Sequence, residues 1–186
     1  MQKKLFIFVG MFAALAINSF AQTNNFQTTA STNLGRPRIV QPKSSGVESS
    51  VIVNTVSLER TAFDLLNQKR VANGLQPLSW NDQLASVARM HSQNMAKFKF
   101  FSHRGLDNKM VSDRADAEGL TKWRAIGENI AFNRGYQDPI GRAVELWLDS
   151  ASHRRNLLDS NWKETAVGIA VTADGEYYLT QVFLTK

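Results

Sequence analysis

The hydrophobic residues of this chain change their spacing several times, and each change marks a predicted element. Between residues 58 and 95 they recur every three or four positions, which is the period of an amphipathic helix. Asn73-Gly74 interrupts the pattern, so it predicts one helix over about 58–72 and a second over about 80–95. Proline suits the first turn of a helix, and Asp138-Pro139 therefore predicts a third. Asp107 is expected to cap a shorter helix before it.

The spacing changes to two near the C-terminus, which is the period of a strand. Apolar residues alternate over 167–171 and again over 178–184, and Asp174-Gly175 lies between them. This arrangement predicts a β-hairpin. The apolar segment 126–132 is expected to form a buried strand. Helices followed by a terminal hairpin predict an α+β fold, in which helices cover a small antiparallel sheet.

The first 21 residues have the pattern of an export signal. Lys3 and Lys4 precede an apolar run over 5–17, and Ser19-Phe20-Ala21 places small residues where cleavage after Ala21 requires them. The apolar run is shorter than a bilayer-spanning helix, and no later segment approaches that length. We therefore expect a secreted or periplasmic protein with no transmembrane segment after signal cleavage.

The region after the predicted signal differs in composition from the rest of the chain. Residues 22–56 are rich in Gln, Thr, Asn, Ser and Gly and hold no lasting period, which predicts a flexible linker. A single folded domain is then expected over 57–186. The chain has no cysteine, so this domain is stabilised by its hydrophobic core without disulfides.

The net charge of +6 belongs largely to the N-terminal region. Five basic residues and one acidic residue precede position 57, so the predicted domain carries 17 basic and 15 acidic side chains. Nucleic-acid binding normally requires a clustered basic face, and we do not expect it here. The expected partner is instead a ligand of the cell envelope or the extracellular space, of unknown identity.

The chain has only three histidines, and they differ in their surroundings. His91 lies on the apolar face of the second predicted helix, where a buried, hydrogen-bonded structural role is expected. His103 follows the end of that helix, in a segment that must turn. His153 lies at a helix start, where the alternative is a ring that faces solvent.

Glu128 lies in an apolar segment, between Ile126 and Ile130-Ala131-Phe132. An unpaired buried carboxylate is very unfavourable, so Glu128 requires a partner. Arg114 or Arg124 would give it a purely structural role, whereas a histidine would be oriented by it. Two histidines and one glutamate match the ligand types of an open zinc site, although ligand type without spacing is not specific. A cysteine nucleophile, a Gly-x-Ser-x-Gly elbow, a phosphate-binding glycine loop and a His-Glu-x-x-His helix are all absent from the sequence.

The order of several motifs resembles the CAP superfamily, also called the SCP-like extracellular domain, in its cysteine-free bacterial branch. This superfamily groups cysteine-rich secretory, antigen-5 and pathogenesis-related proteins. The resemblance covers residues 58–184, and the segments that carry it are 65–70, 74–80, Phe101-Ser102-His103, Gly127-Glu128-Asn129-Ile130, 147–158, Val167-Gly168-Ile169-Ala170 and Thr180-Gln181-Val182-Phe183.

The resemblance implies an α–β–α sandwich with a cleft that holds two histidines and two acidic residues. His103 and His153 match the histidines, and Glu128 matches the acid of the Gly-Glu-Asn motif. The second acid belongs three residues after Trp147, where this chain has Ser150. Zinc or another divalent cation, held by His103, His153 and Glu128, is the cofactor that the resemblance suggests.

Three functions follow as hypotheses, because the family's biochemistry differs among its members and a fold does not decide function. The leading hypothesis is a secreted binding module whose cleft holds a divalent cation or a polar ligand. The second is a metal-assisted hydrolase of peptides or envelope polymers, with Glu128 as the base or as the residue that orients a histidine. The third is a lipid or sterol carrier that uses the apolar residues Phe98, Phe100 and Phe101.

Overall fold

The computed structural model describes residues 4–6 and 54–186 of the chain. The elements follow one another as strand β1 (Lys4–Phe6), helix α1 (Thr55–Ala72), strand β2 (Ser79–Trp80), helices α2 (Asp82–Phe98) and α3 (Val111–Ala117), strand β3 (Ala125–Arg134), helices α4 (Pro139–Asp149) and α5 (Ala151–Leu157), and strands β4 (Glu164–Val171) and β5 (Glu176–Thr185).

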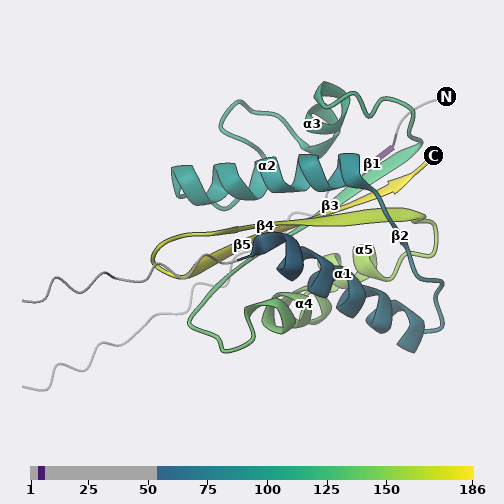
Figure 1. The fold of residues 1–186 in the computed structure, drawn as a ribbon. Coiled ribbons are helices and arrows are strands. Elements are labelled where there is room, and N and C mark those ends of the chain that lie inside the picture. The colour runs from purple at the N-terminus through teal and green to yellow at the C-terminus, as the bar shows by residue number, and fades with distance from the viewer. Residues whose placement is uncertain (1–3, 7–53) are drawn as a thin grey trace, which may run out of the picture. The chain divides into compact units, whose positions relative to one another are not determined.

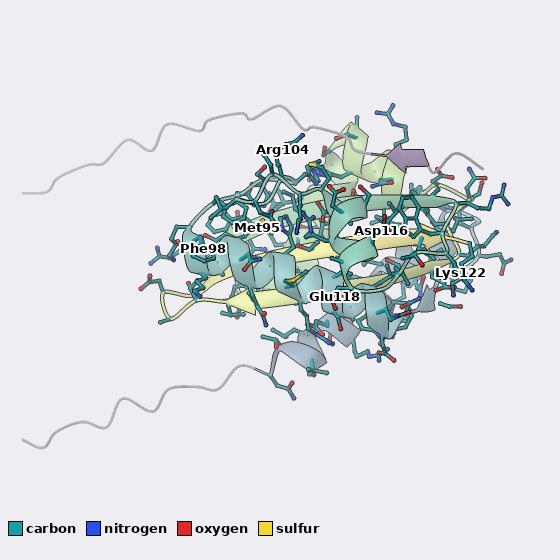
Figure 2. The ribbon with its side chains drawn as sticks, turned by 90° about the horizontal axis from the view of Figure 1, so that it is seen from above. Met95, Phe98, Arg104, Asp116, Glu118 and Lys122 are labelled. Carbon is teal, nitrogen blue, oxygen red and sulfur yellow. The ribbon has the colours of Figure 1, made fainter. Side chains whose placement is uncertain are left out.

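The helices form two layers on opposite faces of one sheet, which is an α–β–α sandwich (Figure 1). Helices α2 and α3 lie on one face, and α1, α4 and α5 lie on the other. Seen from above, Phe98 lies at the outer end of α2, and the loop after it turns back, so that Arg104 lies nearer the middle of the molecule than Phe98 (Figure 2). The predicted fold class, α+β with helices on both sides of a small sheet, is confirmed.

The sheet has the strand order β1-β3-β5-β4-β2. The predicted hairpin is present, since β4 and β5 pair antiparallel, and Gly175 in the turn between them has a φ of +73°. Strand β3 pairs antiparallel with β5 along all ten of its residues. On its other side, β3 pairs only at 125–127, in parallel, with β1. Strand β1 lies inside the predicted signal segment, so a chain cleaved after Ala21 would end its sheet at β3.

Successive side chains of a strand point to opposite faces of the sheet, and a hydrophobic core lies on each face. Ala166 and Val182 pack beneath α2 and α3, together with Leu84, Val111 and Trp123. Their sequence neighbours Val167 and Phe183 pack on the opposite face, with Trp147 of α4 and Leu157 of α5. Glu128 is two residues from Ile126 of the first core and is paired with Val182, so its side chain belongs to the α2 face.

The ends of the helices agree with the predictions in part. Asp138 caps α4 as expected, because its side chain accepts a hydrogen bond from the backbone N–H of Gly141 at 2.8 Å. The prediction for Asp107 is wrong, since its carboxylate accepts from the N–H of Lys109 in the preceding loop. Helix α3 instead begins at Val111, and the side chain of Asp113 accepts from the N–H of Met110 at 2.8 Å. None of the helices in the described part of the chain is long and apolar enough to cross a bilayer.

Candidate functional site

The Gly-Glu-Asn segment of β3 connects the two helical layers. Glu128 faces α2 and α3, whereas Gly127 and Asn129 face α5 on the other side. A side chain at Gly127 would place its Cβ 2.9 Å from the ring of Trp162 and 3.0 Å from the amide oxygen of Asn156. Glycine therefore allows the segment after α5 to pack directly against the backbone of β3.

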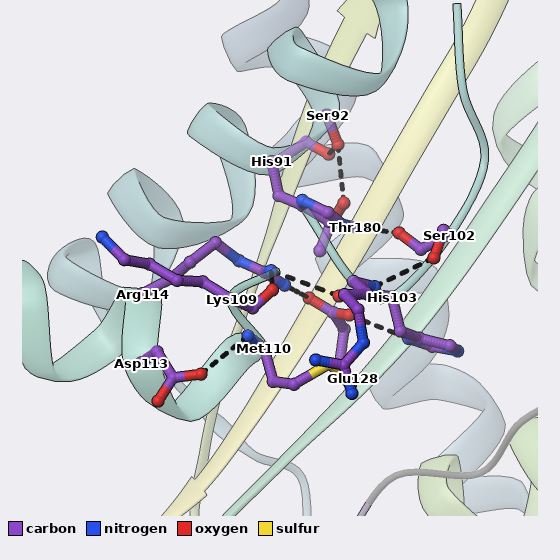
Figure 3. A network of polar contacts seen from close by, with 12 residues as sticks. His91, Ser92, Ser102, His103, Lys109, Met110, Asp113, Arg114, Glu128 and Thr180 are labelled. Atoms are coloured by element: carbon purple, nitrogen blue, oxygen red, sulfur yellow. Dashed lines mark hydrogen bonds and ion pairs between the residues drawn. The ribbon is translucent and has the colours of Figure 1, made fainter. Parts of the chain in front are cut away.

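Glu128 is buried, with 2% of its surface exposed, and it has both of the partner types that the sequence left open. One carboxylate oxygen, Oε1, accepts from Nδ1 of His103 at 2.8 Å, and Oε2 accepts from Nη2 of Arg114 at 2.5 Å (Figure 3). Burial by itself would raise the pKa of Glu128, but the hydrogen bond from His103 and the charge of Arg114 outweigh it and lower the pKa. The carboxylate is therefore ionised at neutral pH.

Arg114 also fixes the loop that carries His103. Its Nη1 donates to the backbone carbonyl of His103 at 3.2 Å and to that of Lys109 at 3.0 Å. The guanidinium is 5% exposed and comes from α3, beyond that loop in sequence. One arginine therefore neutralises Glu128 and holds the backbone of the histidine that Glu128 orients. Arg124, the other predicted partner, donates its backbone N–H to Thr185 at the end of the sheet.

His91 has the structural role that the sequence predicted. The ring is 1% exposed, and its Nε2 lies 2.8 Å from the carbonyl oxygen of Ser102. A carbonyl only accepts, so Nε2 carries the hydrogen. Burial lowers the pKa of His91, which favours the neutral ring. This hydrogen bond holds the backbone immediately before His103, and His91 thus supports the site without entering it (Figure 3).

His153 reaches the same place from the opposite layer. Asn129 donates from its side chain to the carbonyl oxygen of His153 at 3.2 Å. Asn156 donates to the carbonyl oxygen of Glu128 and to the amide oxygen of Asn129, both at 3.1 Å. These bonds hold α5 against β3 and bring the rings of His103 and His153 to a centroid distance of 6.3 Å, with 35° between their planes.

The ring of His153 differs from every other imidazole of the chain in its hydrogen bonding. Both ring nitrogens are buried, and neither has a hydrogen-bond partner among the described residues. Burial, together with the neighbouring His103, lowers the pKa of His153 to about 4. The ring is neutral at pH 7 and offers one donor and one acceptor that the protein does not use.

No carboxylate of α4 takes the place of the second acid that the family resemblance implies at position 150. Ser150 ends α4 and precedes α5, and its hydroxyl lies 3.2 Å from that of Ser152. The two nearby acids of α4 lie elsewhere. Glu145 accepts from Arg142 at 3.3 Å, and Asp149 is exposed.

The donor set fits a metal ion only in part. Among residues 4–6 and 54–186, no group of three or more His, Cys, Asp or Glu side chains is arranged to hold one. Both oxygens of Glu128 already accept hydrogen bonds. The imidazoles of His103 and His153 therefore remain as the side chains that could bind a metal ion. The unpartnered nitrogens of His153 suit a cation, but structural and catalytic zinc sites normally use three or four protein ligands.

Several contributors to the site have no clear signal in the sequence. Arg114 was one of two arginines that could pair with Glu128, and its bonds to the loop backbone were not predicted. Asn129 and Asn156 belong to the family segments quoted above, yet their mutual hydrogen bond joins positions 27 residues apart. Of the three phenylalanines proposed for a lipid carrier, Phe100 and Phe101 pack against Met95, Ile130 and Tyr178, whereas Phe98 is exposed.

The α–β–α sandwich and the terminal hairpin agree with the CAP class of domains (Figure 1). The cysteine-rich secretory protein family, or CAP family, matches residues 63–183, and this chain belongs to that family. The chain is 37% identical over 151 residues to the uncharacterized membrane protein YlbC of Bacillus subtilis, which covers 81% of this chain and 41% of YlbC. It is 27% identical over 166 residues to YkwD of the same organism, covering 89% of this chain and 62% of YkwD. The chain thus spans about half the length of these relatives.

Solved structures agree with this assignment. An extracellular protein of Bacillus anthracis that contains an SCP domain superposes with a TM-score of 0.60 at 32% identity, over 71% of this chain and 41% of that one. An outer surface protein of Borrelia burgdorferi gives a TM-score of 0.65 at 18% identity, over 72% of this chain and 96% of that one. At that identity the second likeness concerns the fold alone. The domain is therefore a CAP domain of the bacterial type.

Proposed function

We propose that this chain is a binding module of the bacterial cell envelope or extracellular medium, and that its ligand contacts the paired rings of His103 and His153. Two features support the location. The sequence has the pattern of an export signal over residues 1–21. The Bacillus anthracis relative is described as extracellular, and the Borrelia one as an outer surface protein.

The observation that carries the proposal is the hydrogen-bonding state of the two rings. Glu128 accepts from Nδ1 of His103, so the neutral ring presents Nε2 as an acceptor. Both nitrogens of His153 are buried and have no partner within residues 4–6 and 54–186, and the ring is neutral at pH 7, since its pKa is about 4. Unsatisfied buried polar atoms are unfavourable for stability, and a ligand that bonds to them recovers that loss.

A divalent d-block cation such as zinc is one ligand of suitable chemistry, because neutral imidazole is its common protein ligand. His103 and His153 would hold it, and Glu128 would orient His103 without touching the ion. Such a cation would supply Lewis acidity to a bound carbonyl or phosphoryl group. The chain's own residues provide the rest: Glu128 fixes the tautomer of His103, and Asn129 fixes the backbone of His153.

A hydrolase is the second candidate function, and one observation favours it. The 2.8 Å contact between Glu128 and Nδ1 of His103 is the arrangement in which a carboxylate orients an imidazole that acts as a general base. The general base would then be His103. Glu128 would be a positioning residue, because both of its oxygens are already occupied.

Calorimetric titration of zinc into the purified protein tests the binding site. The wild type is expected to bind zinc, and the His103→Ala/His153→Ala double variant is expected to lose that binding. A Glu145→Ala/Asp149→Ala variant is the matched control, because it removes two acids of α4 that lie outside the site. Identical zinc binding by the wild type and the histidine double variant would refute the proposed cation site.

A further inference from the structure

The charges around the paired histidines differ from those of an ordinary cation site. Glu128 contributes one negative charge, and Arg114 neutralises it through a contact of 2.5 Å. Both side chains are buried, at 1% and 5% exposure, so solvent screens this pair only weakly. Ser150 carries no charge where the family resemblance places an acid. The buried Glu128–Arg114 pair therefore leaves the site without a net negative charge from carboxylates.

We propose that Arg114 is the specificity-determining residue of this site: its charge weakens the binding of divalent cations and favours uncharged polar ligands. The inference rests on the proposed role of His103 and His153 in binding. Arginine keeps its positive charge at any physiological pH, so its repulsion of a nearby cation is permanent. In addition, Arg114 removes one carboxylate oxygen of Glu128 from the set of available ligands.

The same arginine holds the loop that carries His103 in place. In many metal sites the ion itself holds the loops that bear its ligands, which couples folding to metal binding. Here Nη1 of Arg114 bonds to the carbonyl oxygens of His103 and Lys109, and Nη2 bonds to Glu128. The guanidinium therefore supplies both the charge balance and the loop contacts within the protein itself.

The ligand that fits this arrangement is a neutral group that both donates and accepts hydrogen bonds. Nδ1 of His103 is bonded to Glu128, which leaves its Nε2 for a ligand, and both ring nitrogens of His153 lack a partner among the described residues. A hydroxyl group satisfies one acceptor and one donor at once, without a net charge to be desolvated. Alcohols and the hydroxyls of sugars belong to this class.

The test is a zinc titration by calorimetry of four proteins: the wild type, Arg114→Gln, Arg114→Lys and Ser150→Asp. Arg114→Gln removes the charge but retains an amide donor for Glu128, and it is expected to bind zinc about tenfold more tightly, the order of one partly screened unit charge. Arg114→Lys keeps the charge and is expected to stay within about threefold of the wild type. Thermal melts followed by circular dichroism check that each variant is folded.

Ser150→Asp keeps the inference testable if Arg114→Gln does not fold. Positions 150 and 153 lie three residues apart at the start of α5, so an acid at 150 approaches His153 without touching the contacts of Arg114. It is expected to tighten zinc binding to a similar extent.

Two results overturn the inference: zinc affinity that stays unchanged in both Arg114→Gln and Ser150→Asp, or a tenfold gain in Arg114→Lys. Loss of the whole binding site is distinguishable, because zinc binding would then be the same in the His103→Ala/His153→Ala protein as in the wild type.

Discussion

Replacing His153 with leucine should make the protein more stable, although it removes a central residue of the proposed site. Both nitrogens of this ring are buried without a hydrogen-bond partner among the described residues. A buried polar atom without a partner costs about 1–3 kcal/mol, and an apolar side chain of similar size avoids that cost. Because a bridging water would recover part of it, we expect the free energy of unfolding to rise by about 1 kcal/mol at pH 7.

The stabilisation should increase at acidic pH. The pKa of His153 is about 4 in the folded protein, and that of an unfolded histidine is about 6.5. The unfolded chain therefore binds more protons between these values, and the wild type loses stability as the pH falls from about 6.5 to about 4. The full shift corresponds to about 3 kcal/mol, which the partial solvent contact of this ring reduces to about 2 kcal/mol. The leucine variant lacks this loss, so its advantage should reach about 3 kcal/mol at pH 4.5.

Urea denaturation followed by tryptophan fluorescence at pH 7 and pH 4.5 measures both effects, since the chain has four tryptophans. The matched control is His91→Leu. His91 is buried in the α2 layer, and its Nε2 donates to the carbonyl oxygen of Ser102 at 2.8 Å. Its loss leaves that carbonyl without a partner and should destabilise the protein by about 1–3 kcal/mol. A leucine at position 153 that destabilises the protein at pH 7 by a similar amount would refute the reasoning, because the ring would then have a favourable partner.

Two further predictions concern the buried pair and the packing of α2. Glu128→Gln should lower the free energy of unfolding by about 3–5 kcal/mol, because it leaves the buried charge of Arg114 uncompensated. Urea denaturation measures this loss. A loss below about 1 kcal/mol would show that the Glu128–Arg114 pair is not needed for stability. Gly168→Ala should destabilise the protein by about 3 kcal/mol or more, since the new Cβ would lie 2.1 Å from the backbone nitrogen of Arg89 in α2. Thermal melting compared with Gly135→Ala measures this effect: Gly135 has a φ of +80° but no atom within 4 Å of such a Cβ, so equal losses would show that backbone strain rather than overlap is responsible.

Much of the domain could be predicted from local patterns. The periods of 3.6 and 2 predicted α1, α2, α4 and the terminal hairpin, because amphipathic elements show their buried face in sequence. The helix caps were less predictable. Asp107 precedes α3 and Asp113 lies in its first turn, and both have short side chains that accept hydrogen bonds. The path of the loop decides that Asp113 bonds to the N–H of Met110, at the start of the helix, whereas Asp107 bonds to that of Lys109.

The sequence by itself also indicated His103, Glu128 and His153 as candidate site residues, and it showed a serine at position 150 in place of an acid. Only the tertiary structure decided how they are paired. His103 follows α2 and His153 lies in α5, on opposite faces of the sheet, and their rings meet because the two layers come together around β3. The same packing gave Glu128 both Arg114 and His103 as partners and left His153 with none among the described residues. Hydrogen bonds between residues this far apart in sequence depend on how whole layers pack. Such packing leaves no periodic pattern in the sequence from which these bonds could be predicted.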